Sequence, residues 1–326
     1  MKKLFVTIIV LAITAVGAVL FWATQPIIGA GQPVIAFTIK PGSGVRASME
    51  QIASAGVPLN PILMEILARS SGKSGRIKAG SYELEPGATP NRLLNQLVRG
   101  QFAQHSLVII EGWTFTQMRK AVAEHKALKH DTVNLSEQEL MARVAPGYTR
   151  AEGLFFPDTY LFAKGSSDLQ VYKQAHALLL KNLNDGWLRR DASVPYKTPY
   201  EALIMASIVE KETGLESERT MIAGVFVNRL KIGMLLQTDP TVIYGMGAQY
   251  QGDIRKRDLL TDTPYNTYTR AGLPPTPIAL PGINALAAAL NPAKTDALYF
   301  VSKGNGSSHF SSNLNEHNQA VNKFQR

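Results

Sequence analysis

Residues 198–230, TPYEALIMASIVEKETGLESERTMIAGVFVNRL, decide how the rest of the chain is organised. Thr198 followed by Pro199 is typical of a helix start, and Glu201 would complete a capping box. The side chains of residues 203–209 are apolar in almost every direction around a helix, which predicts that this helix is buried. We therefore expect a core helix to which the remaining segments are fitted.

A second helix is expected after a break at Thr213 and Gly214. Ser217 is its candidate N-cap, and Gly233 is expected to end it. Apolar residues recur on one face of this helix, namely Ile222, Val225 and Phe226. The stretch therefore predicts a packed helix pair.

Two acids, Glu210 and Glu212, stand in the last turn of the first helix. One interpretation is that they are surface acids paired with Lys211 or Arg219. The other is that one of them is a general acid, because apolar surroundings raise the pKa of a carboxyl. The two acids are about 200° apart on a helix, so they cannot face one cleft, and spacing alone does not choose between them.

The chain has 326 residues, enough for one or two domains with their own cores. It has no cysteine, which excludes disulfides, thiolate metal sites and cysteine nucleophiles. Its formal net charge is +9, which suits an anionic partner such as an acidic polymer or membrane surface as well as it suits a merely soluble surface. Nothing indicates nucleic-acid binding.

Residues 4–23 contain no charge and follow two lysines. Twenty apolar residues can span a bilayer, and the lysines predict a cytoplasmic N-terminus with the bulk of the chain exported. A cleaved signal peptide is the main alternative. We predict an uncleaved transmembrane anchor at residues 1–24 and a linker at residues 25–33.

Residues 34–105 are expected to form a small α+β module, and residues 106–326 a larger α+β domain. The module's predicted strands are 34–39 and 77–84, and its predicted helices are 48–55, 61–69 and 90–99. In the larger domain, residues 152–161 read as an aromatic-rich loop. Loops rich in proline and glycine surround the buried helices there, and such loops often build a cleft.

Several kinds of site lack their signature. No histidine pair has HExxH spacing, and neither a GxSxG elbow nor a phosphate loop is present. We expect no metal ion and no cofactor. The polar and aromatic residues of the loops instead suit a carbohydrate, although the same tyrosines could be core residues; the candidates are Gln237, Asp239, Thr241, Tyr244, Tyr265, Asn266, Tyr268 and Asn313.

Six stretches carry a resemblance that covers nearly the whole chain: IKAGSYEL, EGLFFPDTY, ASIVEKET, VFVNRLKIGMLLQTDPTVIYG, YNTY and GLPPTPIALPG. With LYFV and HFSSNLNEHN beyond them, the chain resembles the MltG-type endolytic murein transglycosylases of the YceG-like family. The resemblance implies an inner-membrane protein with a LysM-like module and a periplasmic catalytic domain. It also implies peptidoglycan as substrate and partners among cell-wall synthases and division proteins.

The family pattern selects Glu210, the first acid of IVEKE, as the catalytic residue. A lytic transglycosylase uses no water, so one acid can protonate the glycosidic oxygen and then remove the proton of the MurNAc 6-hydroxyl. The product would carry a 1,6-anhydro end.

Two other functions remain as alternatives. A membrane-anchored, non-catalytic peptidoglycan-binding scaffold would fit the anchor and the module equally well. A pyridoxal-phosphate lyase would need a Schiff-base lysine in a phosphate-binding fold, and the sequence shows no such constellation.

Overall fold

The computed structural model describes residues 2–325, except for the side chains of Lys2, Leu4, Phe5, Ile8, Ala12 and Ala15. The chain divides into two compact units, residues 1–105 with 161–166 and residues 106–160 with 167–326. Both combine helices with short strands, and the strands pair two by two into sheets. The predicted mixed α+β class is therefore confirmed.

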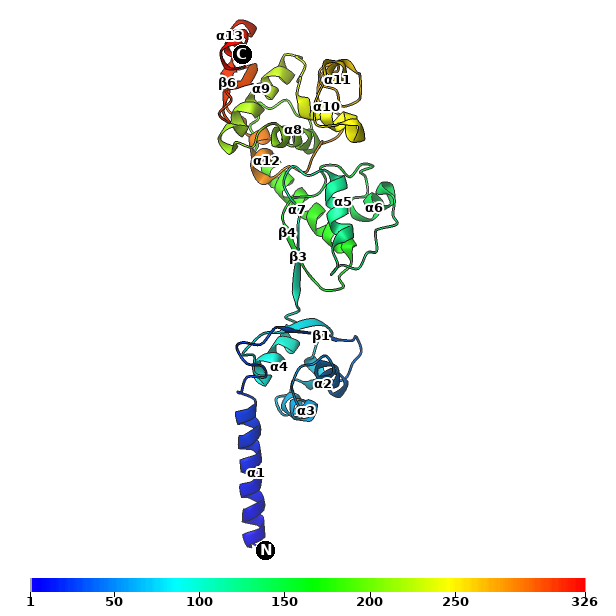
Figure 1. Cartoon of the computed structure of the whole chain (residues 1–326), viewed down its shortest axis with the longest axis vertical. Coiled ribbons are helices and arrows are strands. Elements are labelled where there is room, and N and C mark those ends of the chain that lie inside the picture. The colour runs from blue at the N-terminus through cyan, green and yellow to red at the C-terminus, as the bar shows by residue number, and fades with distance from the viewer. Residues whose placement is uncertain (1, 326) are drawn as a thin grey trace. The chain divides into compact units, whose positions relative to one another are not determined.

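The first unit begins with α1 (Lys2–Trp22), the helix expected to be the anchor (Figure 1). Over the residues that the structure describes, no helix is both long and apolar enough to cross a membrane. The transmembrane anchor stays a prediction.

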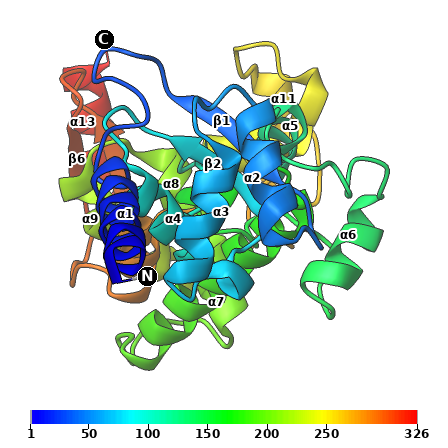
Figure 2. The same cartoon turned by 90° about the horizontal axis from the view of Figure 1, so that it is seen from below.

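The rest of the first unit is a small module in which two helices separate two paired strands. Its elements are β1 (Ile35–Ile39), α2 (Val45–Ser54), α3 (Pro61–Ser70), a 3-10 turn (Ser74–Arg76), β2 (Gly80–Leu84) and α4 (Pro90–Arg99). β1 and β2 are antiparallel, with Ile35 opposite Leu84 and Ile39 opposite Gly80. Figure 2 shows α2 and α3 side by side, and α2 also packs on β1.

Two predicted boundaries of the module are wrong. The second strand starts at Gly80 and not at residue 77, because the backbone of Lys78 bonds to Leu97 at the end of α4. Gly80 has φ +150°, and a Cβ there would lie 2.3 Å from the Phe102 ring. The first helix starts at Val45, and the Ser48 hydroxyl donates to the carbonyl of Gly44, so Ser48 lies inside the helix.

In the second unit, α8 (Pro199–Glu212) is the central helix, and it packs against α7, α9 and α12 (Figure 1). The other helices are α5 (Phe115–Glu124), α6 (Glu137–Val144), α7 (Asp168–Leu188), α9 (Arg219–Lys231), α10 (Asp239–Met246), α11 (Lys256–Leu260), α12 (Ile283–Leu290) and α13 (Leu314–Phe324). Its strands are β5 (Tyr299–Ser302) and β6 (Ser308–Ser311), whereas β3 (Gln104–Val108) and β4 (Thr159–Ala163) each have residues in both units. β3 pairs with β4, and β5 pairs antiparallel with β6.

The sequence prediction for α8 is confirmed in its main feature, because residues 202–209 are all buried. Thr198 caps the helix by accepting the N–H of Glu201. The predicted capping box is wrong in one half, since the Glu201 carboxylate accepts the N–H of Lys197 and not that of Thr198.

The N-cap predicted for α9 is also wrong. A 3-10 turn (Glu216–Glu218) precedes α9, and Ser217 lies within it, so that Glu218 becomes the N-cap. The segment after α12 then runs along α9, where the Asn228 amide donates to the carbonyls of Thr295 and Ala297. These bonds lead the chain directly into β5 beside the end of α9.

Candidate active site

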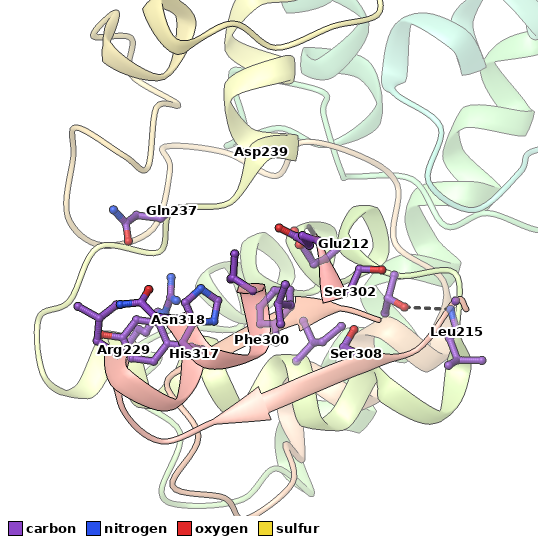
Figure 3. A pocket seen from close by; sticks show the side chains of 18 of the residues that line it. Glu212, Leu215, Arg229, Gln237, Asp239, Phe300, Ser302, Ser308, His317 and Asn318 are labelled. Carbon is purple, nitrogen blue, oxygen red and sulfur yellow. Dashed lines mark hydrogen bonds between the residues drawn. The ribbon is translucent and has the colours of Figure 1, made fainter. Parts of the chain in front are cut away.

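A cavity of about 1100 Å³ lies in the second unit, at the end of α8. One part of its wall comes from the loop before α10 and from Tyr268, and another part comes from β5, β6 and α13. Figure 3 shows Gln237 and Asp239 on the segment above Glu212, Phe300 and His317. Residues from seven separate segments of the chain therefore share one hollow.

Glu212 is the last residue of α8 and lines this cavity. The Thr238 hydroxyl donates to its Oε2 over 2.6 Å. Burial raises the pKa of Glu212; the bond from Thr238 opposes that rise, and the charge of Asp239 adds to it. Glu212 thus holds its proton more tightly than a free carboxyl does, and it borders an open space.

Asp239 is the second carboxyl on the cavity, and its side chain is exposed. It is the first residue of α10, and the Tyr268 hydroxyl donates to its Oδ1 over 2.6 Å. Two residues earlier, Gln237 has φ +49° and is the only non-glycine residue with positive φ in the described part of the chain. Backbone strain of this kind concentrates at functional sites.

Arg229 joins the two parts of the wall. Its side chain is buried, with 7% of the residue exposed. Its Nε donates to the carbonyl of Leu298 and its Nη1 to the carbonyl of Leu236, both over 2.7 Å. Its guanidinium lies 5.4 Å from the centre of the Tyr299 ring. No acid forms an ion pair with Arg229 among the described residues, so a buried positive charge borders the cavity.

Glu210 lies elsewhere and is absent from the cavity wall. Its Oε2 accepts the N–H of Gly282 over 2.9 Å, and its Oε1 is 3.3 Å from Nη2 of Arg219. Burial raises the pKa of Glu210, against the effects of the Gly282 bond and of Arg219. The carboxylate thus ties the end of α8 to the starts of α9 and α12, and the two acids face different ways, as their spacing predicts.

Three of the predicted sugar-binding residues line the cavity: Gln237, Asp239 and Tyr268. Thr241 and Asn266 are fully buried, so a sugar in the cavity could not reach their side chains. The Thr241 hydroxyl bonds to Thr238 and Thr267, and the Asn266 amide bonds to three backbone carbonyls of residues 258–261. Both side chains are placed to hold the loops in shape and not to touch a ligand.

The remaining three predicted residues lie outside the cavity wall. Tyr244 and Tyr265 pack edge to face, 4.8 Å between ring centres, and the Tyr244 hydroxyl donates to the buried Glu152. Asn313 is the N-cap of α13, where it accepts the N–H of Glu316. These positions correspond to the alternative in which the tyrosines are packing residues and the asparagine is a cap.

Sequence reasoning missed the part of the wall contributed by the C-terminal segment. Tyr299, Ser302, Ser308, His317 and Asn318 line it. The last two belong to the stretch HFSSNLNEHN, which the family resemblance includes but which carries no spacing signal of its own. Only the resemblance could have drawn attention to them.

The chain is similar to several known proteins. A model of the YceG-like family matches residues 37–323. A Bacillus subtilis (strain 168) protein named endolytic murein transglycosylase is 30% identical over 319 residues, which cover 92% of this chain and 87% of that protein. A Streptococcus pneumoniae (strain D39) protein of the same name is 27% identical, and the match covers 91% of this chain but only 59% of the streptococcal protein.

A solved structure is also similar. The crystal structure of a YceG-like protein from Listeria monocytogenes matches with a TM-score of 0.56 and 29% identity. The match covers 88% of this chain and 98% of the Listeria chain.

Proposed function

This chain belongs to the YceG-like family, and on that premise we propose that it is an endolytic murein transglycosylase. It cleaves the glycosidic bond between MurNAc and GlcNAc within peptidoglycan strands and leaves 1,6-anhydro-MurNAc ends. The observation that carries the proposal is a half-buried carboxyl, Glu212, whose pKa burial raises and which lies at the edge of a cavity large enough for an oligosaccharide.

We assign the acid to Glu212, although the family pattern read from the sequence selects Glu210. A general acid must reach the bond that it protonates. Glu212 borders the cavity, and among the described residues only Thr238 bonds to its carboxyl. Both oxygens of Glu210 are already engaged by Arg219 and Gly282, and protonation would weaken that ion pair.

In the first step, protonated Glu212 donates its proton to the glycosidic oxygen, and the bond from that oxygen to C1 of MurNAc breaks. The GlcNAc leaves with a free 4-hydroxyl. The positive charge at C1 is taken up by the N-acetyl oxygen of the same sugar. Asp239, which Tyr268 holds on the cavity wall, supplies a negative charge that stabilises this cation.

In the second step, the Glu212 carboxylate removes the proton from the MurNAc 6-hydroxyl, and O6 attacks C1. The acid is thereby returned to its protonated state, and no water is consumed. This is why one carboxyl is sufficient, whereas a hydrolase needs a second one to activate water or to act as nucleophile.

The pair Glu212→Gln and Glu210→Gln tests the assignment. Loss of a general acid typically reduces the rate by about 10²–10⁴-fold, and we expect such a loss in kcat for Glu212→Gln only. Cleavage of purified glycan strands is followed by mass spectrometry of the products, with circular dichroism as the control for folding.

The opposite pattern, an active Glu212→Gln protein and a folded but inactive Glu210→Gln protein, would move the acid to Glu210. Retained binding without cleavage by the wild-type chain under any condition would favour the scaffold function.

We also propose that residues 4–23 anchor the protein in the inner membrane as a single span, that the bulk of the chain is periplasmic, and that residues 34–105 act as a LysM-like module. The uncharged run supports the anchor, and the order β1–α2–α3–β2 supports the module. Cell-wall synthases and division proteins are the partners that such a location would offer. Reporter fusions at each terminus test the orientation.

A further inference from the structure

The part of the cavity wall that β5 and α13 contribute includes aromatic rings. The Tyr299 ring stacks on the His317 ring, with 5.1 Å between centres and 25° between planes. On the Tyr299 ring also lies the buried guanidinium of Arg229. These three groups form one stack, called here the Arg229–Tyr299–His317 stack, which joins α9, β5 and α13 at the cavity.

The stack has the composition of a sugar site. Carbohydrate ligands combine apolar ring faces with hydroxyl and amide groups, so their sites combine aromatic rings with polar side chains. The same cavity is also lined by Asn318, Ser302 and Ser308. Figure 3 shows His317 and Asn318 together on the same part of the wall, with Gln237 near them.

His317 carries an unused hydrogen-bonding atom. Its Nδ1 is shielded from solvent and has no hydrogen-bond partner among the described residues. A buried acceptor without a partner is tolerated more readily than a buried N–H, which favours the tautomer of the neutral ring with its proton on Nε2. Burial and the charge of Arg229 lower the pKa of His317, which keeps the ring neutral. Nε2–H is then the donor that His317 offers to a ligand.

Resting on the transglycosylase function proposed above, we propose that the Arg229–Tyr299–His317 stack and Asn318 form a subsite that binds an N-acetylated sugar ring of the glycan strand away from the bond that is cut. His317 donates from Nε2 to an oxygen of that sugar. The C-terminal segment from β5 to α13 is therefore part of the substrate site.

The test measures binding separately from cleavage. Full-length protein carrying Glu212→Gln is titrated with an uncrosslinked GlcNAc–MurNAc tetrasaccharide in a calorimeter, and His317→Ala is added to the same background. We expect affinity to fall roughly tenfold, and we expect His317→Gln, which keeps an N–H donor, to recover part of it. The imidazole ¹⁵N signals of His317 should shift when the sugar is added.

His309→Ala is the matched control, because His309 also packs on an aromatic ring, that of Phe324, but does not line the cavity. It should bind as the parent does. In otherwise wild-type enzyme, His317→Ala should raise KM about tenfold with kcat nearly unchanged, as expected for binding that is equal in ground and transition states.

Equal affinities of the His317→Ala and His309→Ala proteins, both folded, would overturn the subsite. Failure of the catalytic assignment would look different: cleavage would persist in Glu212→Gln, whatever the affinity measured for the His317 variants.

Discussion

Two neighbours of Glu212 act on its pKa in opposite directions. The Thr238 hydroxyl stabilises the carboxylate and lowers the pKa, while the charge of Asp239 raises it. Because the first step requires protonated Glu212, activity should fall as the pH rises through the pKa of this group. Changing either neighbour should therefore move the alkaline limb of the pH profile.

We predict that Asp239→Asn moves this limb to lower pH and that Thr238→Val moves it to higher pH. The measurement is kcat/KM for glycan cleavage across the pH range, whatever the change in maximal rate. Shifts in the same direction, or none in either variant, would show that Glu212 is not the group that titrates.

At the scale of single residues, the sequence identified the two acids but could not choose between them. Their neighbours along the helix are equally apolar, and what separates them is contact with distant segments. The carboxylate of Glu210 bonds to Gly282 and Arg219. The carboxyl of Glu212 bonds to Thr238 and lines the cavity. No spacing within the helix encodes those contacts.

Among the elements, α8, α9 and α12 meet at the Glu210–Arg219 ion pair. Both side chains are nearly buried, with exposed fractions of 6% and 10% respectively. Removing one partner of a buried pair leaves the other charge uncompensated, which typically costs about 3–5 kcal/mol.

We predict that Glu210→Ala lowers the free energy of unfolding by about 3 kcal/mol, and that Glu210→Gln combined with Arg219→Met costs less than Glu210→Ala alone. Urea unfolding at neutral pH measures both. If the double variant were less stable than Glu210→Ala, the cost of Glu210→Ala would not come from leaving the Arg219 charge uncompensated. The ion pair would then stabilise the fold more than uncharged residues do.

The elements that sequence patterns could predict are those with strong local signals. The apolar composition of residues 202–209 predicts a buried helix, and Thr198 predicts where that helix starts. The sequence predicts a loop around Asp239-Pro240, because turn residues surround this pair. In the structure the helix α10 begins at Asp239. The start of α9 was misplaced because a 3-10 turn precedes it and includes the expected cap, Ser217.

At the scale of the whole molecule, stability should depend on a buried carboxyl that takes no part in the proposed chemistry. Glu152 is 6% exposed; it accepts the N–H of Phe115 at the start of α5 and the hydroxyl of Tyr244 on α10. Burial raises its pKa from 4.5 to about 7. The folded state therefore binds this proton more tightly than the unfolded chain does, and its contribution is lost as the pH rises.

We predict that Glu152 contributes about 3 kcal/mol to the fall in stability of the second unit between about pH 4.5 and about pH 8, the equivalent of this pKa difference. In Glu152→Gln, which keeps an acceptor for Phe115, the decline should be smaller by about this amount. Denaturant unfolding at several pH values gives the comparison. An unchanged pH dependence in the variant would assign the decline to other groups.

For the molecule as a whole, the mixed α+β class and the family could be predicted, because long family stretches run from the module to the last helix. The cavity could not. It arises where Arg229 bonds to the carbonyls of Leu236 and Leu298 and so brings the loop before α10 and β5 to one place. Contacts between residues almost seventy positions apart leave no periodic trace in the sequence.

The most direct test of the central claim follows the oxygen atoms. Glycan strands are cut by the wild-type chain in water enriched in heavy oxygen, and the new ends are weighed by mass spectrometry. Transfer to the MurNAc 6-hydroxyl, with Glu212 as the sole acid and base, predicts 1,6-anhydro ends that contain no heavy oxygen. Reducing ends that carry the heavy isotope would contradict it, and would mean that water attacks C1 with a second carboxyl, first of all Asp239, as its base.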